Sequence, residues 1–309
     1  MNGRLPNFLI AGAAKCGTTS LAAWLSAHPQ AFVPPSKELA FFELDEIFRR
    51  GPGWYARQFE DAGDALAVGE ATPSYMFYPW SVERIEQLVP NVRIVVCLRN
   101  PADRAYSHYL HWRDRLMLEP RTFACAMDDE LAAGGTEVAQ HRPRGKPPYF
   151  AYLARGLFLA QLERLAGAFG PERVHVVLLD DLRADSAAAY AGVCRFLEID
   201  DDFVPETLGG SENPYQRHRR DWLVRPLVRA RVMQRLPNPM AEFIVRHVFP
   251  PVAQPVPPPD PEARHRLVEF FAPHNDALGA WLGRDLSSWN DGEPVAMQAA
   301  AALSATRAA

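Results

Sequence analysis

The chain alternates between short apolar runs and longer stretches in which apolar positions recur at helical spacing. Continuous, valine-rich runs are typical of strands buried on both faces of a parallel sheet. They cover residues 8–11, 65–72, 92–99 and 173–180. Helical spacing lies between them, at residues 18–27, 80–88, 101–113, 153–169 and 186–196. This alternation predicts a three-layer α/β fold, similar to that of P-loop NTPases, with a central parallel sheet flanked by helices. Ligands of such sheets bind at the carboxyl ends of the strands.

The expected organisation is one domain followed by a short tail. With 309 residues and 48% hydrophobic content, the chain can bury a sizeable core. We expect residues 1–292 to form a single domain. Residues 293–309 offer little to bury and predict a disordered tail. Residues 115–148 are irregular and predict a lid or acceptor loop.

The first candidate for chemistry is the stretch AGAAKCGTTS, residues 11–20, between the first predicted strand and helix. Gly12 and Gly17 have the spacing of a phosphate-binding loop, but Thr18 stands where an ATP-binding loop has lysine, and Lys15 lies earlier. Strand, turn and helix N-terminus still direct backbone N–H groups at an anion. The sequence therefore predicts a cradle for an anion with fewer consecutive phosphates than ATP. The simpler alternative is a tight turn with Thr18 or Thr19 as N-cap.

A second anion site is predicted within CLRNPADRAYSHYLHWRD, residues 97–114. Arg99 ends a predicted strand, and Pro101 is suited to the first turn of a helix. Arg99 offers a bidentate fork for a phosphate monoester, and Ser107 adds a hydroxyl. The alternative is a solvated face on which Arg99 and Arg104 pair with nearby aspartates.

In order and spacing, these segments resemble a known family. Together with KELAFFE, GWY, RGLF and VVLLDDL, they resemble the sulfotransferases that use 3′-phosphoadenosine 5′-phosphosulfate (PAPS), over roughly residues 7–290. The similarity is greatest to the branch with the heparan-sulfate N- and O-sulfotransferase domains and their bacterial relatives. It implies an enzyme whose product is the 3′,5′-bisphosphate PAP. It also implies that Arg99 and Ser107 bind the 3′-phosphate, and that the loop binds the 5′-phosphosulfate through Lys15, Cys16, Gly17, Thr18, Thr19 and Ser20.

Sulfuryl transfer needs a cation at the leaving phosphate and a base for the acceptor's proton. As in phosphoryl transfer, positioning and electrostatics carry most of the catalysis. Lys15 is the expected cation, and Lys37 is expected to assist at the sulfuryl group. Glu38 is the expected base, because its apolar neighbours would desolvate it and raise its pKa. The resemblance gives the matching glutamate this role. The alternative is a surface ion pair of Lys37 and Glu38.

A basic cluster occupies residues 213–236, with seven arginines and a single acid. By its position it corresponds to the family's late basic loop, so we expect Arg217 or Arg219 to reach the 3′-phosphate. The heparan-type loop has a disulfide and a glycine-rich run that this sequence lacks. A solvated helix face, or a docking site for an anionic acceptor or membrane surface, is the alternative.

The composition of the chain limits the kinds of partner that the protein is expected to have. A formal net charge of −4 gives no general attraction to nucleic acid. The four cysteines have no paired spacing and the nine histidines no ligand spacing, which argues against disulfides and a metal site. The sequence has no uncharged apolar run long enough to predict a membrane-spanning helix. We therefore expect a cytoplasmic protein, from a bacterium given the Ala, Arg and Pro content, and a homo-oligomer is compatible with the sequence.

Two other classes of function stay open at this stage. A P-loop nucleotide-dependent phosphotransferase or kinase would use Asp180 or Asp181 after a strand, although the shifted lysine weighs against it. A non-catalytic nucleotide-binding relative would have the same fold but would have lost the catalytic activity. The sequence does not identify the acceptor: a small molecule or a carbohydrate with a hydroxyl or amine would suit the aromatic residues of its variable segments.

Overall fold

The protein is described by a computed structural model. It covers residues 4–36, 38–115, 119–132, 151–210 and 256–291, and the backbone alone of residues 216–218 and 251–253. The expected tail, residues 293–309, lies outside this part. The single domain over residues 1–292 stays a prediction.

The core is a five-stranded, all-parallel sheet in the order β2-β3-β1-β4-β5. Its strands are β1 (Phe8–Gly12), β2 (Ala31–Phe32), β3 (Ala67–Ala71), β4 (Arg93–Leu98) and β5 (Val174–Leu178). Every residue of β1 and β3 is buried, as the continuous apolar runs predict. The α/β fold expected from the sequence is thus confirmed. A separate antiparallel pair joins β6 (Gln216–His218) to β7 (Pro251–Ala253).

Helices connect and cover the strands. They are α1 (Thr18–Ser26), α2 (Asp45–Phe48), α3 (Gly51–Arg57), α4 (Pro79–Leu88), α5 (Pro101–Leu110), α6 (Phe123–Ala132), α7 (Phe158–Phe169), α8 (Leu179–Ala184), α9 (Ser186–Leu197) and α13 (Pro261–Leu282). Short 3₁₀ turns occur at Glu60–Ala62, Ala154–Gly156, Pro171–Arg173 and Ser287–Asn290. Among the helices of the described segments, none is long and apolar enough to cross a membrane.

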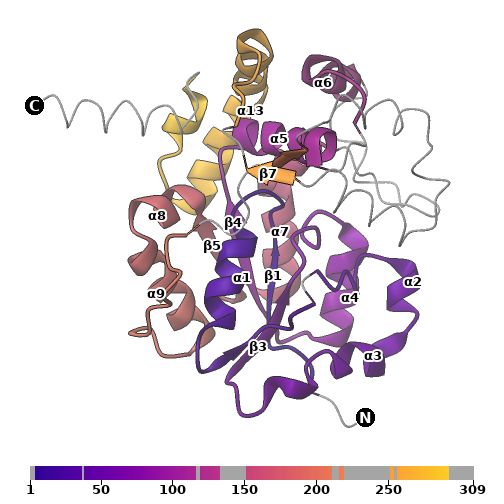
Figure 1. Ribbon diagram of the computed structural model, residues 1–309, viewed down its shortest axis with the longest axis vertical. Helices are drawn as coiled ribbons and strands as arrows, with labels where there is room; N and C mark the ends of the chain where they lie inside the picture. The colour runs from indigo at the N-terminus through magenta and orange to yellow at the C-terminus, as the bar shows by residue number, and fades with distance from the viewer. Residues whose placement is uncertain are drawn as a thin grey trace, which may run out of the picture.

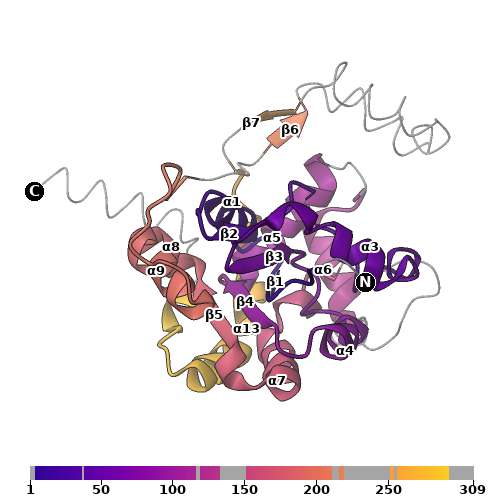
Figure 2. The same ribbon diagram turned by 90° about the horizontal axis from the view of Figure 1, so that it is seen from below.

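The helices form two layers around the sheet. In Figures 1 and 2, α1 and α9 lie on one side of the sheet, and α4 and α7 lie on the other. In Figure 1, α5 lies across the molecule above the strands, and the upright helix α13 begins beside it at the top. Helices from distant parts of the chain thus meet at this end of the sheet, where α13 contacts α5.

The structure departs from the sequence-based expectation at several places. The helix expected over residues 101–113 changes after α5 into a π-helical turn, His111–Arg115. The run 173–180 is divided between β5 and α8. The helix expected over 153–169 begins as a 3₁₀ turn. Strand β2 and helices α2, α3, α6 and α13 were not expected, and α6 lies within the segment 115–148 that was expected to be irregular.

A buried carboxylate fastens β3 to its surroundings. Glu70 is 1% exposed. One of its oxygens accepts hydrogen bonds from the hydroxyls of Tyr55 at 3.1 Å and Tyr75 at 2.6 Å, and the other accepts from Thr72 Oγ1 at 2.6 Å. Burial raises the pKa of Glu70, and the three hydroxyl donors oppose that rise. Thr72 Oγ1 in turn accepts from the backbone N–H of Ala40 at 3.2 Å. The network thus ties the chain that follows β2 to the sheet.

We predict that Glu70→Gln lowers the free energy of unfolding by about 1–3 kcal/mol. Either orientation of the new amide would place an NH₂ group where an oxygen now accepts a hydroxyl. Urea denaturation measures the loss. Tyr55→Phe is the control, because it removes one donor and leaves the carboxylate its other partners. A loss no larger in Glu70→Gln than in Tyr55→Phe would contradict this role of the carboxylate.

Candidate active site

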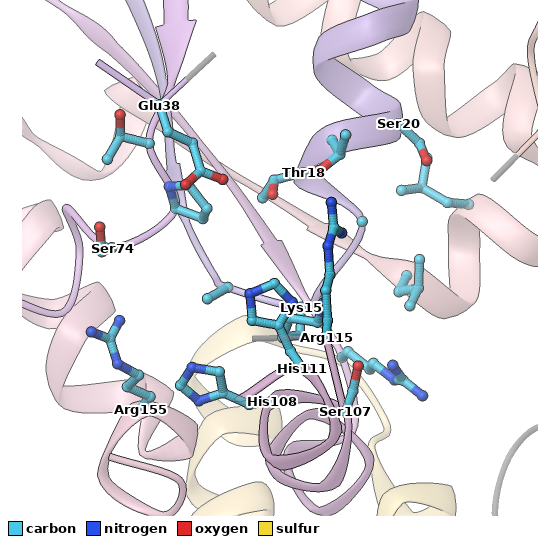
Figure 3. Close-up of a pocket in the computed structure, with 18 of the residues that line it drawn as sticks. Lys15, Thr18, Ser20, Glu38, Ser74, Ser107, His108, His111, Arg115 and Arg155 are labelled. Carbon is cyan, nitrogen blue, oxygen red and sulfur yellow. The ribbon is translucent and has the colours of Figure 1, made fainter. Parts of the chain in front are cut away.

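A pocket lies at the carboxyl edge of the sheet. Its volume is about 1050 Å³. The residues that line it follow β1, β3, β4 and β5, so the four strands deliver their next residues to one place. Figure 3 shows Lys15 near the centre, with Glu38 and Ser74 on one side and Ser107 below. The pocket is therefore where the site predicted from the sequence should be sought.

The first predicted loop forms one wall of this pocket. Lys15, Gly17, Thr18, Thr19 and Ser20 all line it. Gly17 is the N-cap of α1 and has a φ of 92°, and no side chain caps this helix end. The alternative of a threonine N-cap is therefore wrong. A left-handed backbone at this point favours glycine, and the helix N-terminus beyond it is suited to an anion.

Cys16 departs from the expectation for this loop. Its side chain is fully buried, and it is not among the residues that line the pocket. Its backbone N–H bonds to the carbonyl of Ala13 at 3.2 Å. Burial raises the pKa of the thiol to about 12. The side chain of Cys16 therefore packs beneath the loop, with its N–H engaged inside it, and the binding of the cofactor by this residue stays a prediction.

The second predicted pair reaches the same pocket from β4 and α5. Arg99 and Ser107 both line it. Asn100 is the N-cap of α5, and its side chain accepts from the N–H groups of Ala102 and Asp103 at 2.9 and 3.3 Å. This cap fixes the start of the helix that carries Ser107. Arg99 also lies 3.7 Å from Asp103, so the predicted ion pair and the pocket position occur together.

Glu38 lines the pocket but is exposed, contrary to the expected burial. Its apolar neighbours turn into the core instead: Leu39 is 6% exposed, and Phe41 and Phe42 are completely buried. The backbone of Glu38 is left-handed, with a φ of 61°, which turns its side chain away from them. The argument that these neighbours desolvate Glu38 is therefore wrong for this structure.

A second carboxylate, Glu43, lines the same side of the pocket. Ser74 Oγ donates a hydrogen bond to it. Burial raises the pKa of Glu43, the charge of Glu38 raises it further, and Ser74 and Arg155 oppose the rise. A carboxylate whose pKa is raised is closer to the range useful for proton transfer at neutral pH. Sequence reasoning missed Glu43, although it ends the KELAFFE segment.

Two histidines, His108 of α5 and His111 of its π-helical extension, also line the pocket. Burial and nearby cations lower the pKa of His108 well below its usual value, and burial, Lys15 and Arg115 lower that of His111 to about 3. His108 Nε2 accepts from Trp112 Nε1 at 2.8 Å, so its neutral form carries the proton on Nδ1. Both rings are therefore neutral at physiological pH.

The family is decided by comparison of the sequence. The family model described as "Sulfotransferase domain" matches residues 5–210, well over half of the chain. The chain belongs to the sulfotransferase family. The predicted resemblance is confirmed, and membership implies PAPS-dependent transfer of a sulfuryl group.

Individual relatives agree with this family. A human bifunctional heparan sulfate N-deacetylase/N-sulfotransferase 3 is 26% identical over 296 residues, which is 93% of this chain and 31% of that protein. A membrane-associated sulfotransferase kil1 of Dictyostelium discoideum is 32% identical over 126 residues, 39% of this chain and 26% of that protein. The chain thus spans less than a third of the length of these curated relatives. A solved sulfotransferase of Alicyclobacillus acidocaldarius is 31% identical with a TM-score of 0.68, covering 93% of this chain and all of that one.

Three predicted residues cannot be placed in the sulfotransferase site. Lys37 and Arg219 lie outside the described residues, and of Arg217 only the backbone is described, in β6. That strand contacts the π-helical turn His111–Arg115, which itself lines the pocket. The roles of these residues stay predictions. Within the described segments, no group of three or more His, Cys, Asp or Glu is arranged to hold a metal ion.

Other pocket residues were not assigned from the sequence. Ser74 follows β3, Arg155 belongs to the RGLF segment, and Arg183 lies in α8 after β5. Arg155 stacks over the ring of Phe77 at 4.2 Å and donates to the hydroxyl of Tyr78 at 2.7 Å. The position of these residues just beyond a strand, or within a motif of the family, is the signal that could have found them.

We predict that His111 makes the free energy of unfolding depend on pH. Its usual pKa of 6.5 falls to about 3 in the folded protein, so between these values the unfolded chain binds more protons. Stability therefore falls as pH decreases from about 6.5 toward 3, by up to about 1.4 kcal/mol per pH unit from this group. The measurement is the difference in urea stability between wild type and His111→Gln across that range. A difference that does not change with pH would exclude this role of His111.

Proposed function

We propose that this protein transfers a sulfuryl group from PAPS to a hydroxyl or amine of a small-molecule or carbohydrate acceptor. The observation that carries the proposal is the presence of two anion-binding sets in one pocket. One is the loop with Lys15 and the N-terminus of α1, and the other is Arg99 with Ser107. PAPS has one anionic group at each end of its ribose, so one set can hold the 5′-phosphosulfate and the other the 3′-phosphate. These residues fit the donor without a triphosphate site.

In the proposed reaction, PAPS supplies the sulfuryl group on its 5′-phosphate. Glu38 accepts the proton of the attacking hydroxyl or amine as the bond from that oxygen or nitrogen to sulfur forms. Lys15 stabilises the negative charge that grows on the phosphate oxygen as its bond to sulfur breaks. Lys37 assists at the sulfuryl group. Glu43 is a second candidate base, supported by its burial and its raised pKa.

The lining of the pocket supports a polar acceptor with a flat or ringed part. Trp112 and Arg155 line it together with Glu38, Glu43 and Ser74. Aromatic side chains stack on sugars and on aromatic rings alike. The human relative named above is a heparan sulfate N-sulfotransferase by its name, which adds support for a carbohydrate. The bacterial source, the cytoplasmic location and a homo-oligomer remain predictions of the sequence.

A nucleotide kinase is the weaker alternative. It would use an acid after β5 to hold Mg²⁺, but Asp181 is engaged by Arg284 at 2.8 and 3.1 Å, and Asp180 accepts from Trp289 Nε1 at 2.7 Å. A non-catalytic relative is disfavoured because Lys15, Glu38, Arg99 and Ser107 all occur in one pocket.

The choice of donor can be tested with the unreactive product. We expect 3′,5′-bisphosphate (PAP) to raise the melting temperature strongly and 5′-AMP weakly, because only PAP fills both anion sites. At a hundredfold excess over Kd, PAP should stabilise the fold by about 2.7 kcal/mol. Differential scanning calorimetry measures the shift. Equal stabilisation by ATP with Mg²⁺ would refute the assignment of the donor and support the kinase.

The proposed roles of Lys15 and Glu38 predict that their substitutions differ in their effects on the transfer rate and on the affinity for PAP. Glu38→Gln cannot accept a proton, so single-turnover transfer should slow by roughly 10²–10⁴-fold while the affinity for PAP hardly changes. Lys15→Ala should lower both, because the donor is anionic before and during transfer. Transfer is followed by mass spectrometry with an acceptor found by screening, and affinity by calorimetry.

Glu43→Gln is the matched control for the base. If Glu38→Gln keeps more than about a tenth of wild-type transfer and Glu43→Gln does not, the base is Glu43. If both keep it, neither carboxylate is the base. His108 and His111 would be tested next, although their lowered pKa values make them weak bases.

A further inference from the structure

A second arginine faces Arg99 across the ends of two neighbouring strands. Strands β4 and β5 pair in parallel, with Leu98 opposite Leu178, so the residues that follow them lie at the same edge. Arg99 follows β4 directly, and Arg183 lies in α8, which follows β5. Both side chains line the pocket. Two guanidinium groups that follow separate strands therefore line the same pocket.

The two arginines are close enough to affect each other. The pKa of Arg183 is lowered, first by burial and then by the charge of Arg99, while Asp180 and Asp103 oppose the change. Bringing like charges together is unfavourable unless an anion offsets them. In a purely structural cluster, acids would bridge such arginines at hydrogen-bond distance.

The acids near the two arginines are instead held by other groups. Asp103 lies 3.7 Å from Arg99, and Asp180 lies 3.7 Å from Arg183, both beyond hydrogen-bond distance. Asp103 makes its short contact, 2.7 Å, with the guanidinium of Arg264 in α13. Arg264 is 5% exposed and Asp103 is 8% exposed, so this pair is buried.

The second acid is held in the same way. Asp180 accepts from Trp289 Nε1 at 2.7 Å, and Trp289 lies in the 3₁₀ turn Ser287–Asn290. The carbonyl of Trp289 also accepts from Asn100 Nδ2 at 3.0 Å, beside Arg99. Residues 261–290, which lie beyond the segment matched by the family, thus draw both acids away from the pocket arginines. Each arginine keeps a longer ion pair with its acid, and among the described residues neither guanidinium donates a hydrogen bond, so its donors can serve a ligand.

We propose that Arg183 is a second donor-binding residue, which together with Arg99 holds the 3′-phosphate of PAPS. This inference rests on the proposed function. A phosphate monoester carries close to two negative charges at neutral pH and accepts hydrogen bonds on three oxygens. Two guanidinium groups match both that charge and that number of acceptors. Arg183 thereby distinguishes nucleotides with a 3′-phosphate from those without one.

The test compares two ligands that differ in the 3′-phosphate alone. Calorimetric affinities for PAP and 5′-AMP are measured with wild type, Arg183→Ala, Arg183→Lys and Arg99→Ala. We expect Arg183→Ala to weaken PAP binding by about 10- to 100-fold, the usual effect of losing a charged hydrogen bond. Its affinity for 5′-AMP should change by less than about twofold, because that ligand makes no contact there. Arg183→Lys should bind PAP with intermediate affinity, since it keeps the charge and loses the fork.

Arg195→Ala is the matched control. Arg195 is an exposed arginine of α9 that pairs with Asp201 at 2.7 Å, so its removal changes the net charge equally outside the pocket. It should leave both affinities unchanged. Melting temperatures of the variants verify that each is folded, and Arg183→Lys serves the comparison if Arg183→Ala is unstable.

The outcomes separate this inference from the proposed function. If wild type binds PAP no better than 5′-AMP, the assignment of the donor fails. If wild type prefers PAP and the two Arg183 variants keep the full preference, Arg183 is not a donor-binding residue, while the proposed function stands. Equal weakening for both ligands would likewise refute contact with the 3′-phosphate.

Discussion

The accumulation of positive charge at the carboxyl edge of the sheet is the constraint to which the rest of the site responds. Lys15, Arg99, Arg104, Arg155 and Arg183 all lie at or just beneath this edge. Burial, and after it the charges of neighbouring arginines, lowers the pKa of Arg104 to about 10 and the pKa of His108 well below its usual value. The histidines consequently act as neutral hydrogen-bonding groups. A donor with two anionic ends would reduce the repulsion among these cations when it binds.

Buried carboxylates hold these cations in place without neutralising the pocket. Glu130 in α6 accepts from the backbone N–H groups of Tyr152, Leu153 and Ala154 at 2.7, 2.9 and 2.9 Å. It therefore fixes the turn that carries Arg155. Arg104 donates to the carbonyl of Tyr152 in the same turn. Asp103 and Asp180 are bound outside the pocket as well, by Arg264 and by the indole of Trp289. Apart from Glu38 and Glu43, which line the pocket, these acids are engaged by the scaffold.

The sequence predicts those parts of the site that depend on short-range patterns. The β1 loop, Arg99 and Ser107 could be found because a strand, a turn and a helix start leave a local signal. Arg183 could not be found in this way, because the neighbouring Asp180 and Asp181 give the appearance of a solvated helix start. Only the distant Trp289 and Arg284 show that these acids are engaged elsewhere. Long-range partners of this kind leave no periodicity in the sequence.

The same reasoning explains the elements that were missed. Strand β2 has two residues, too few for an alternating pattern to be recognised. Helix α13 contains Pro273 in its interior, and proline normally indicates a helix end.

The exposure of Glu38 shows how the fold determines the chemistry of a residue that the sequence places correctly. Leu39 and Phe41 both turn into the core, while Glu38 before them and Ala40 between them do not. The chain achieves this with left-handed backbones at Glu38 and Ala40, whose φ angles are 61° and 50°. Such conformations cost about 1–2 kcal/mol in a residue other than glycine. The buried aromatic contacts of Phe41 and the Ala40–Thr72 hydrogen bond offset that cost. Glu38 is thus directed to the pocket by the packing of its neighbours, and its carboxylate is exposed because they are buried.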